Sequence, residues 1–221
     1  MALGFRYVET DVHATADGVL VAFHDDRLDR VTDRTGVVAT MTWAEVRAAR
    51  VGGQEPILRF DELLEALPDV RINVDPKHDA AVEPLIATIR RAGAMERICV
   101  GSFSDRRIAR IRSALGPGVC TALGPREVVG LRAAAWGLPA VERLLRGRPG
   151  QCVQIPARAY GVHLVTKGSI AIAHRMGLPV HVWTVNAESE MHRLLDLGVD
   201  GIMSDHPGLL REVLRSRGAW V

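Results

Sequence analysis

The chain has 221 residues and a formal net charge of +2 at pH 7, with 48% hydrophobic and 24% charged residues. This balance is typical of a globular protein with a sizeable core, and the length suits a single domain over residues 1–221. No run of like charges and no apolar run of about 18 residues occurs, so neither a nucleic-acid-binding protein nor a membrane-spanning protein is indicated.

The first predicted strand, residues 6–13, carries acidic side chains on one face. Glu9, Asp11 and His13 occupy every second position, so a strand directs all three to the same side and its valines to the other. Two neighbouring carboxylates repel each other unless a positive charge lies between them, and a hard divalent cation would supply that charge. The alternative is a solvated strand edge with an ordinary surface histidine.

A second apolar run, residues 19–23, returns after an Asp17-Gly18 pair and ends at His24-Asp25. The aspartate there could orient the imidazole of the histidine, or it could serve as a loop or capping residue. A polar loop follows, and residues 42–45 have the capping-box pattern that begins a short helix.

The rest of the chain alternates between short apolar strands and helical patterns, the order typical of β/α units around a parallel sheet. Further strands are expected at residues 70–77, 97–103, 119–123, 152–156, 179–186 and 201–205. Helices are expected at residues 60–67, 80–92, 105–115, 125–145, 167–176, 188–197 and 207–217. Counting the first strand, the chain contains about seven β/α units, one short of a (β/α)₈ barrel.

Polar side chains gather where the predicted strands end. Alternation along residues 70–77 puts Asp75 and Lys77 on one face, and Gln154, Trp183 and Asn186 lie near the ends of later strands. In a barrel, these carboxyl ends open onto one face, where the loops build the active site.

Several motifs follow one another in a fixed order over nearly the whole chain. They are Glu9-x-Asp11, Phe23-His24-Asp25, Leu28-Asp29-Arg30-Val31-Thr32, Asp75-Pro76-Lys77, Ser102-Phe103, Trp183-Thr184-Val185-Asn186 and the run from Leu197 to Pro207. Together they resemble the glycerophosphodiester phosphodiesterase family. The resemblance implies a TIM (β/α)₈-type barrel hydrolase that uses a divalent cation to cleave glycerophosphodiesters to glycerol 3-phosphate and an alcohol.

Two features depart from the family pattern. The family strand with His-Arg-Gly, which carries a catalytic histidine, has no counterpart in this sequence, so the resemblance implies a barrel lacking its first strand and helix. One alternative function is therefore a catalytically impaired barrel that binds phosphate and metal, and another is a related metal-dependent phospholipase of the same fold. Asp75 stands where the family more often has glutamate, a side chain one methylene longer.

The resemblance also implies roles for the residues of the site. Glu9, Asp11 and Asp75 would bind the cation, and a set of oxygen ligands favours Mg²⁺, Ca²⁺ or Mn²⁺. His24 would act as the general acid/base, because an imidazole exchanges protons near neutral pH. Lys77 would place its positive charge on a phosphate oxygen, or it would simply pair with Asp75.

The substrate-binding residues would be Lys77, Gln154, Trp183 and Asn186. Trp183 would pack against the glycerol or alcohol moiety, although a large apolar residue on a strand is more often part of the core. The expected partner is a small-molecule glycerophosphodiester, and no nucleic acid or transmembrane segment is expected.

The three cysteines lie far apart in apolar surroundings, without the spacing of a metal-binding motif. An odd number of such residues is typical of buried thiols in a reducing compartment. Because the first residues also lack the pattern of a signal peptide, we expect a cytoplasmic protein.

Overall fold

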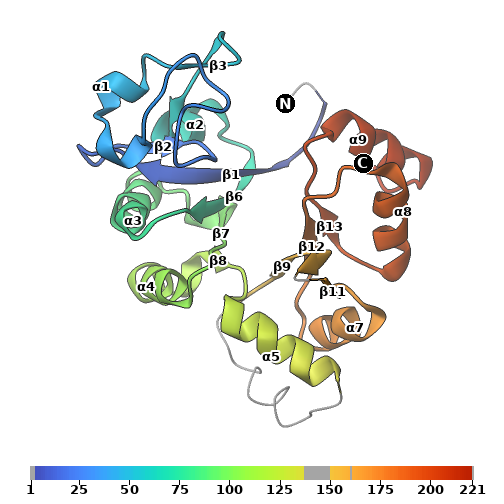
Figure 1. The fold of residues 1–221 in the computed structure, drawn as a ribbon. Helices are drawn as coiled ribbons and strands as arrows, with labels where there is room; N and C mark the ends of the chain where they lie inside the picture. The colour runs from blue at the N-terminus through green and yellow to red at the C-terminus, as the bar shows by residue number, and fades with distance from the viewer. Residues whose placement is uncertain (1–2, 137–149, 160, 221) are drawn as a thin grey trace. The chain divides into compact units, whose positions relative to one another are not determined.

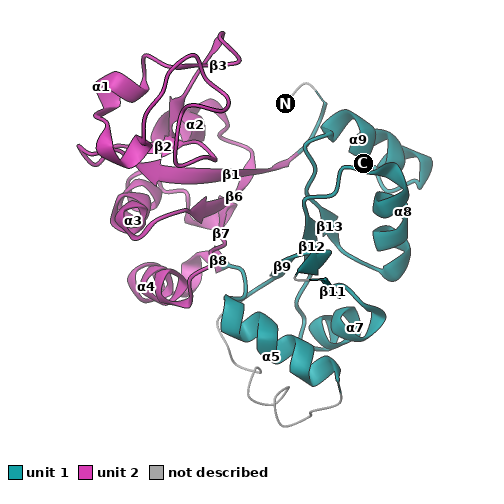
Figure 2. Ribbon diagram, in the orientation of Figure 1, with its two compact units in different colours: residues 1–5, 121–221 teal, residues 6–120 magenta. Residues whose placement is uncertain are grey.

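The computed structural model describes residues 3–136, 150–159 and 161–220. The chain divides into two compact units: unit 1 comprises residues 1–5 and 121–221, and unit 2 comprises residues 6–120 (Figure 2). Strands and helices alternate along both units, as the sequence predicts (Figure 1).

Unit 2 is built on a mixed sheet in which the strands lie in the order β5-β2-β1-β6-β7-β8. In chain order these strands are β1 (Tyr7–Ala14), β2 (Leu20–Ala22), β5 (Leu58–Arg59), β6 (Arg71–Pro76), β7 (Ile98–Val100) and β8 (Cys120–Thr121). β2 runs antiparallel to β1, which confirms the predicted return of the chain, and β6 runs parallel to both β1 and β7. A second small pair joins β3 (Arg50–Val51) and β4 (Glu55–Pro56).

The helices of unit 2 contribute to two hydrophobic clusters, and Val46 of the first helix belongs to the cluster with Val21, not to the one that the other three helices share. These helices are α1 (Trp43–Val46), α2 (Phe60–Ala66), α3 (Val82–Arg91) and α4 (Asp105–Leu115), with 3₁₀ turns η1 (Val38–Thr40), η2 (Asp79–Ala81), η3 (Met95–Arg97) and η4 (Gly116–Gly118). Phe60, Leu85 and Ile111 from α2, α3 and α4 are 0% exposed and share one core with the valines and isoleucines of β1, β6 and β7. Because side chains alternate along a strand, the polar residues of β1 and β6 face away from these helices.

The buried position of Phe60 in the core of unit 2 predicts a large effect of its replacement on stability. We expect Phe60→Ala to lower the free energy of unfolding by about 3–5 kcal/mol, because it leaves a cavity at a fully buried position. The matched control is Phe103→Ala, since Phe103 is 66% exposed and its loss is expected to cost less than about 1 kcal/mol. Urea unfolding followed by circular dichroism measures both, and equal losses would contradict the assignment of the core.

Unit 1 contains a parallel sheet in the order β13-β12-β9. The strands of this sheet are β9 (Val153–Pro156), β12 (Val180–Trp183) and β13 (Gly201–Ile202), and a separate antiparallel pair joins β10 (Arg158–Ala159) and β11 (Val162–His163). The helices of unit 1 are α5 (Pro125–Ala135), α7 (Lys167–Arg175), α8 (Glu188–Leu197) and α9 (Pro207–Ser216). Of the helix expected over residues 125–145, positions 137–145 lie outside the described residues. None of the helices in the described ranges has the length and apolar character needed to cross a membrane.

Candidate active site

The acidic residues of β1 and β6 lie side by side because these strands are parallel neighbours. The register pairs Asp11 with Asp75 and Glu9 with Asn73. Asp11 is only 6% exposed, and Asp75 is half-buried. The predicted grouping of Asp75 with the carboxylates of the first strand therefore follows from the pairing of two consecutive parallel strands.

Lys77 follows directly after β6 and places its ammonium group against these carboxylates. Its Nζ lies 2.7 Å from Asp11 Oδ1 and 3.9 Å from Asp75 Oδ2. The backbone N–H of Lys77 donates to the Val12 carbonyl at 3.1 Å, which extends the pairing of β1 and β6 by one residue. The ion pair with Asp75, which the sequence offers as the alternative role of Lys77, is therefore present, but the closer partner is Asp11.

His24 lies just beyond β2, where the Phe23 N–H donates to the Asp11 carbonyl at 2.9 Å. Its Nε2 is 3.8 Å from Asp11 Oδ2, and its Nδ1 is 2.7 Å from Asp25 Oδ1. Arg30 binds the same aspartate with two hydrogen bonds of 2.7 and 2.8 Å. These contacts from Arg30 and His24 hold the pKa of the Asp25 carboxyl well below its usual value. Asp25 therefore remains an acceptor for a proton on His24 Nδ1, which leaves Nε2 directed toward Asp11.

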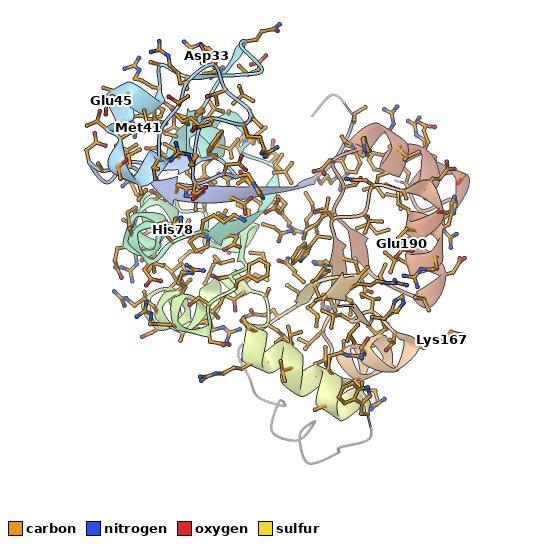
Figure 3. All side chains as sticks on the ribbon, viewed as in Figure 1. Asp33, Met41, Glu45, His78, Lys167 and Glu190 are labelled. Carbon is orange, nitrogen blue, oxygen red and sulfur yellow. The ribbon has the colours of Figure 1, made fainter. Side chains whose placement is uncertain are left out.

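His13 is 1% exposed and contacts the backbone of His24, the candidate catalytic histidine. Its Nε2 is 3.1 Å from the backbone carbonyl oxygen of His24, and its ring centroid is 5.2 Å from that of His78, a residue labelled in Figure 3. Burial is the largest cause of the lowered pKa of His13. A neutral imidazole with its proton on Nε2 fits this position, so His13 supports the segment that carries His24.

Two carboxyl groups of the site have raised pKa values. Loss of hydration raises the pKa of Glu9 to about 7, and the neighbouring Asp11 carboxylate adds to this shift. Glu9 is nevertheless an exposed residue, so the loss of hydration at its carboxyl is incomplete. Loss of hydration likewise raises the pKa of Asp75 to about 6, against the opposing effect of the Lys77 ammonium. These carboxylates repel one another in a partly desolvated site, and a bound cation would relieve that repulsion.

The donor set fits a hard divalent cation by its chemistry. Glu9, Asp11 and Asp75 offer oxygen atoms, and Asp75 Oδ1 is buried without a hydrogen-bond partner among the described residues. The three carboxylates are not among the described groups whose ligand atoms all lie within 4.8 Å of one another. Binding one cation would therefore require at least one of these side chains to rotate toward the others.

The remaining substrate-binding candidates lie in unit 1. Gln154 on β9 contacts His181 Nδ1 on β12 at 3.4 Å, and Trp183 ends β12 half-buried. Asn186 donates to Asp205 at 2.9 Å and accepts from the Ser204 hydroxyl at 3.1 Å. The Asn186 amide thus organises the loop after β13, a role that the position of this residue in the sequence did not reveal.

Sequence reasoning assigned no role to Arg30 or to two residues beside Asp75, Ser102 and Arg107. Arg30 and Ser102 lie in motifs that resemble the family pattern, but such a motif does not indicate which side chain each of its residues contacts. Arg107 has a side chain that is only 16% exposed although it is a charged residue in the first turn of α4. No periodicity in the sequence separates it from the exposed arginines nearby.

Comparison with known proteins points to one family. The family model described as "Glycerophosphoryl diester phosphodiesterase family" matches residues 1–209. "Probable glycerophosphodiester phosphodiesterase 2" of Mycobacterium tuberculosis (strain ATCC 25618 / H37Rv) is 42% identical over 99% of this chain and 83% of its own length. "Glycerophosphodiester phosphodiesterase" of Caldanaerobacter subterraneus subsp. tengcongensis is 25% identical over 99% of this chain and 89% of its own length.

Solved structures with the same family designation share the fold. One from Silicibacter pomeroyi DSS-3 has a TM-score of 0.80 and 27% identity, and the match covers 100% of this chain and 87% of that chain. The glycerophosphodiester phosphodiesterase of Agrobacterium tumefaciens str. C58 has a TM-score of 0.71 and 23% identity over 95% and 88% of the two chains. The predicted (β/α)₈-type barrel class is thereby confirmed.

Proposed function

The chain belongs to the glycerophosphoryl diester phosphodiesterase family, and we propose that the residues gathered on β1, β2 and β6 carry out its phosphodiester hydrolysis. The products would be glycerol 3-phosphate and an alcohol. The observation that carries this proposal is the convergence of Asp11, Asp75, Lys77 and His24 at one polar end of the unit 2 sheet. We further propose that residues 1–221 act as one catalytic domain, because the family model extends through both units.

We propose that Glu9, Asp11 and Asp75 bind a divalent cation, Mg²⁺, Ca²⁺ or Mn²⁺. Two observations support this assignment: Asp75 Oδ1 is buried with no hydrogen-bond partner among the residues that the structure describes, and the pKa values of Glu9 and Asp75 are raised. When bound, such a cation supplies positive charge that stabilises the charge on the phosphoryl oxygens.

His24 is the proposed general acid. In hydrolysis, an oxygen from water bonds to phosphorus as the bond between phosphorus and the leaving oxygen breaks. The leaving alkoxide then needs a proton, and His24 Nε2 can donate it. Asp25 holds the opposite ring nitrogen at 2.7 Å, and Arg30 keeps Asp25 ionised. These contacts fix the orientation of the His24 ring. Its Nε2 remains accessible to a substrate, since the side chain of His24 is 70% exposed.

Lys77 is the proposed contact for a phosphate oxygen, where its charge would act on the developing negative charge. Its Nζ lies 2.7 Å from Asp11 Oδ1 and 3.9 Å from Asp75 Oδ2, and the side chain is 24% exposed. Gln154, Trp183 and Asn186 remain proposed contacts for the glycerol or alcohol moiety of a small-molecule glycerophosphodiester. The family relatives give no support to the alternatives of a binding module without catalysis or a phospholipase.

A direct assay tests the proposed function. The chain, treated with EDTA and then dialysed, is incubated with glycerophosphocholine, and glycerol 3-phosphate is measured by an enzyme-coupled assay. We expect turnover to be lost after chelation and restored by Mg²⁺, Ca²⁺ or Mn²⁺. Release of a head group from intact phospholipid, with none from glycerophosphocholine, would instead favour the phospholipase. Turnover that persists without any cation would refute the metal assignment.

The raised carboxyl pKa values predict how cation binding depends on pH. Below a pKa of about 7 for Glu9 and about 6 for Asp75, these groups hold protons that must leave before their oxygens bind a cation. We therefore expect the affinity for Mn²⁺ to rise with pH through this range and then to level off. Calorimetric titrations at pH 6.5 in two buffers of different protonation enthalpy would reveal the released protons. An affinity that does not change with pH would contradict the prediction.

A further inference from the structure

Two side chains beyond the proposed ligands contact Asp75 or the strand end that carries it. Ser102, two residues after β7, donates a hydrogen bond to the Asp75 carboxyl, and this contact lowers the pKa of that group. Arg107, in the first turn of α4, donates from Nε to Ser102 Oγ at 2.9 Å. The Arg107 charge also acts on Asp75 and favours its ionised form.

The hydrogen bonds of Ser102 fix the direction of its own proton. A hydroxyl group has one proton to donate and two lone pairs to accept. The Ser102 oxygen accepts from Arg107 Nε at 2.9 Å and from the Ser104 backbone N–H at 3.3 Å. With both lone pairs engaged, its proton remains for the Asp75 carboxyl.

Arg107 also holds the end of the neighbouring strand. Its Nη1 donates to the backbone carbonyl of Lys77 at 2.9 Å and lies 3.8 Å from Asp79 Oδ1. A single, mostly buried guanidinium therefore fixes both the hydroxyl that contacts Asp75 and the residue that ends β6. Such a planar group with donors in fixed directions is suited to join two strand ends.

We propose that Arg107 and Ser102 are positioning residues that hold one oxygen of Asp75 and thereby present its other oxygen, Oδ1, to the cation. This inference rests on the proposed function, since it concerns the same cation site. It accounts for why Asp75 Oδ1 is buried with no hydrogen-bond partner in the described part of the chain, while the carboxyl accepts a hydrogen bond from Ser102. Outer residues of this kind fix the orientation of a carboxylate ligand and so raise its affinity for metal.

The test is Mn²⁺ affinity, measured on the full chain by electron paramagnetic resonance of free Mn²⁺, without any activity assay. We expect Ser102→Ala and Arg107→Met each to weaken binding by about tenfold. Because both act through one chain of contacts, the double variant should be no weaker than about the worse single variant. Ser102→Thr keeps the hydroxyl and should restore most of the affinity.

Controls separate positioning from general loss of structure. Arg110→Met removes an arginine of the same helix that pairs with Glu83 at 2.7 Å, and it should leave Mn²⁺ affinity unchanged. Should Arg107→Met fail to fold, the comparison of Ser102→Ala with Ser102→Thr decides. Unchanged affinity in Ser102→Ala, while Asp75→Asn loses binding, would overturn this inference alone. Unchanged affinity in Asp75→Asn would overturn the cation site of the proposed function as well.

Discussion

Replacing His24 with alanine is expected to lower kcat by about 10²–10⁴-fold, the usual contribution of a positioned general acid. The leaving alkoxide would then take its proton from water, while the carboxylates of β1 and β6 stay in place. Because the side chain of His24 is 70% exposed, its removal should leave the fold intact. Steady-state release of glycerol 3-phosphate from glycerophosphocholine measures the effect.

The controls for His24→Ala identify the proton donor specifically. His192→Ala, which removes a histidine whose nearest acidic partner is Glu188 at 3.9 Å, should keep full turnover. Asp25→Asn should give a smaller loss than His24→Ala, because it removes only the support of the ring. Mn²⁺ affinity should stay within a few-fold in all three. Full turnover by His24→Ala would refute the proposed role.

Replacing Asp11 with asparagine is expected to have the second large effect, a loss of Mn²⁺ affinity of at least about 100-fold. That figure is the upper end of what the loss of an outer-shell partner costs, and a direct ligand should cost no less. Asp11 is also the partner of Lys77 Nζ at 2.7 Å, so its replacement leaves that ammonium without its closest carboxylate. Turnover should fall together with cation binding.

Asp69→Asn is the matched control, because Asp69 is an exposed aspartate of the same unit. It should bind Mn²⁺ and turn over substrate as the unsubstituted chain does. If Asp11→Asn binds Mn²⁺ normally yet turns over poorly, Asp11 serves Lys77 and His24 and is not a metal ligand. That result would leave Glu9 and Asp75 as the proposed ligands.

The parts of the site that follow from strand periodicity could be predicted from the sequence. Alternation alone places Glu9 and Asp11 on one face, and the parallel pairing of consecutive strands brings Asp75 beside Asp11. The position of His24 followed from the return of the chain after the first strand, confirmed as the antiparallel pair of β1 and β2. These features depend on backbone geometry, which short-range patterns specify well.

The contacts that depend on side-chain conformation could not be predicted. Lys77 is closer to Asp11 than to Asp75, although Asp75 is nearer in sequence. Arg30 donates hydrogen bonds to Asp25, and Arg107 is mostly buried. No periodic pattern in the sequence distinguishes these two residues from the other arginines, of which the chain has 26 in all. Which of many long, flexible side chains reaches a given carboxylate is decided by distances between elements that a one-dimensional pattern does not contain.

The two lysines give this chain an unusual chemical property. Lys167 is exposed at the start of α7 (Figure 3), whereas the Lys77 ammonium is held against Asp11 and its side chain is 24% exposed. An amine-selective acylating reagent has only these two side-chain amines to modify, because the other 26 of the 28 lysine and arginine residues are arginines. The acylation of Lys77 relative to Lys167, read by peptide mass spectrometry, therefore reports on events at the site with an internal standard in the same molecule.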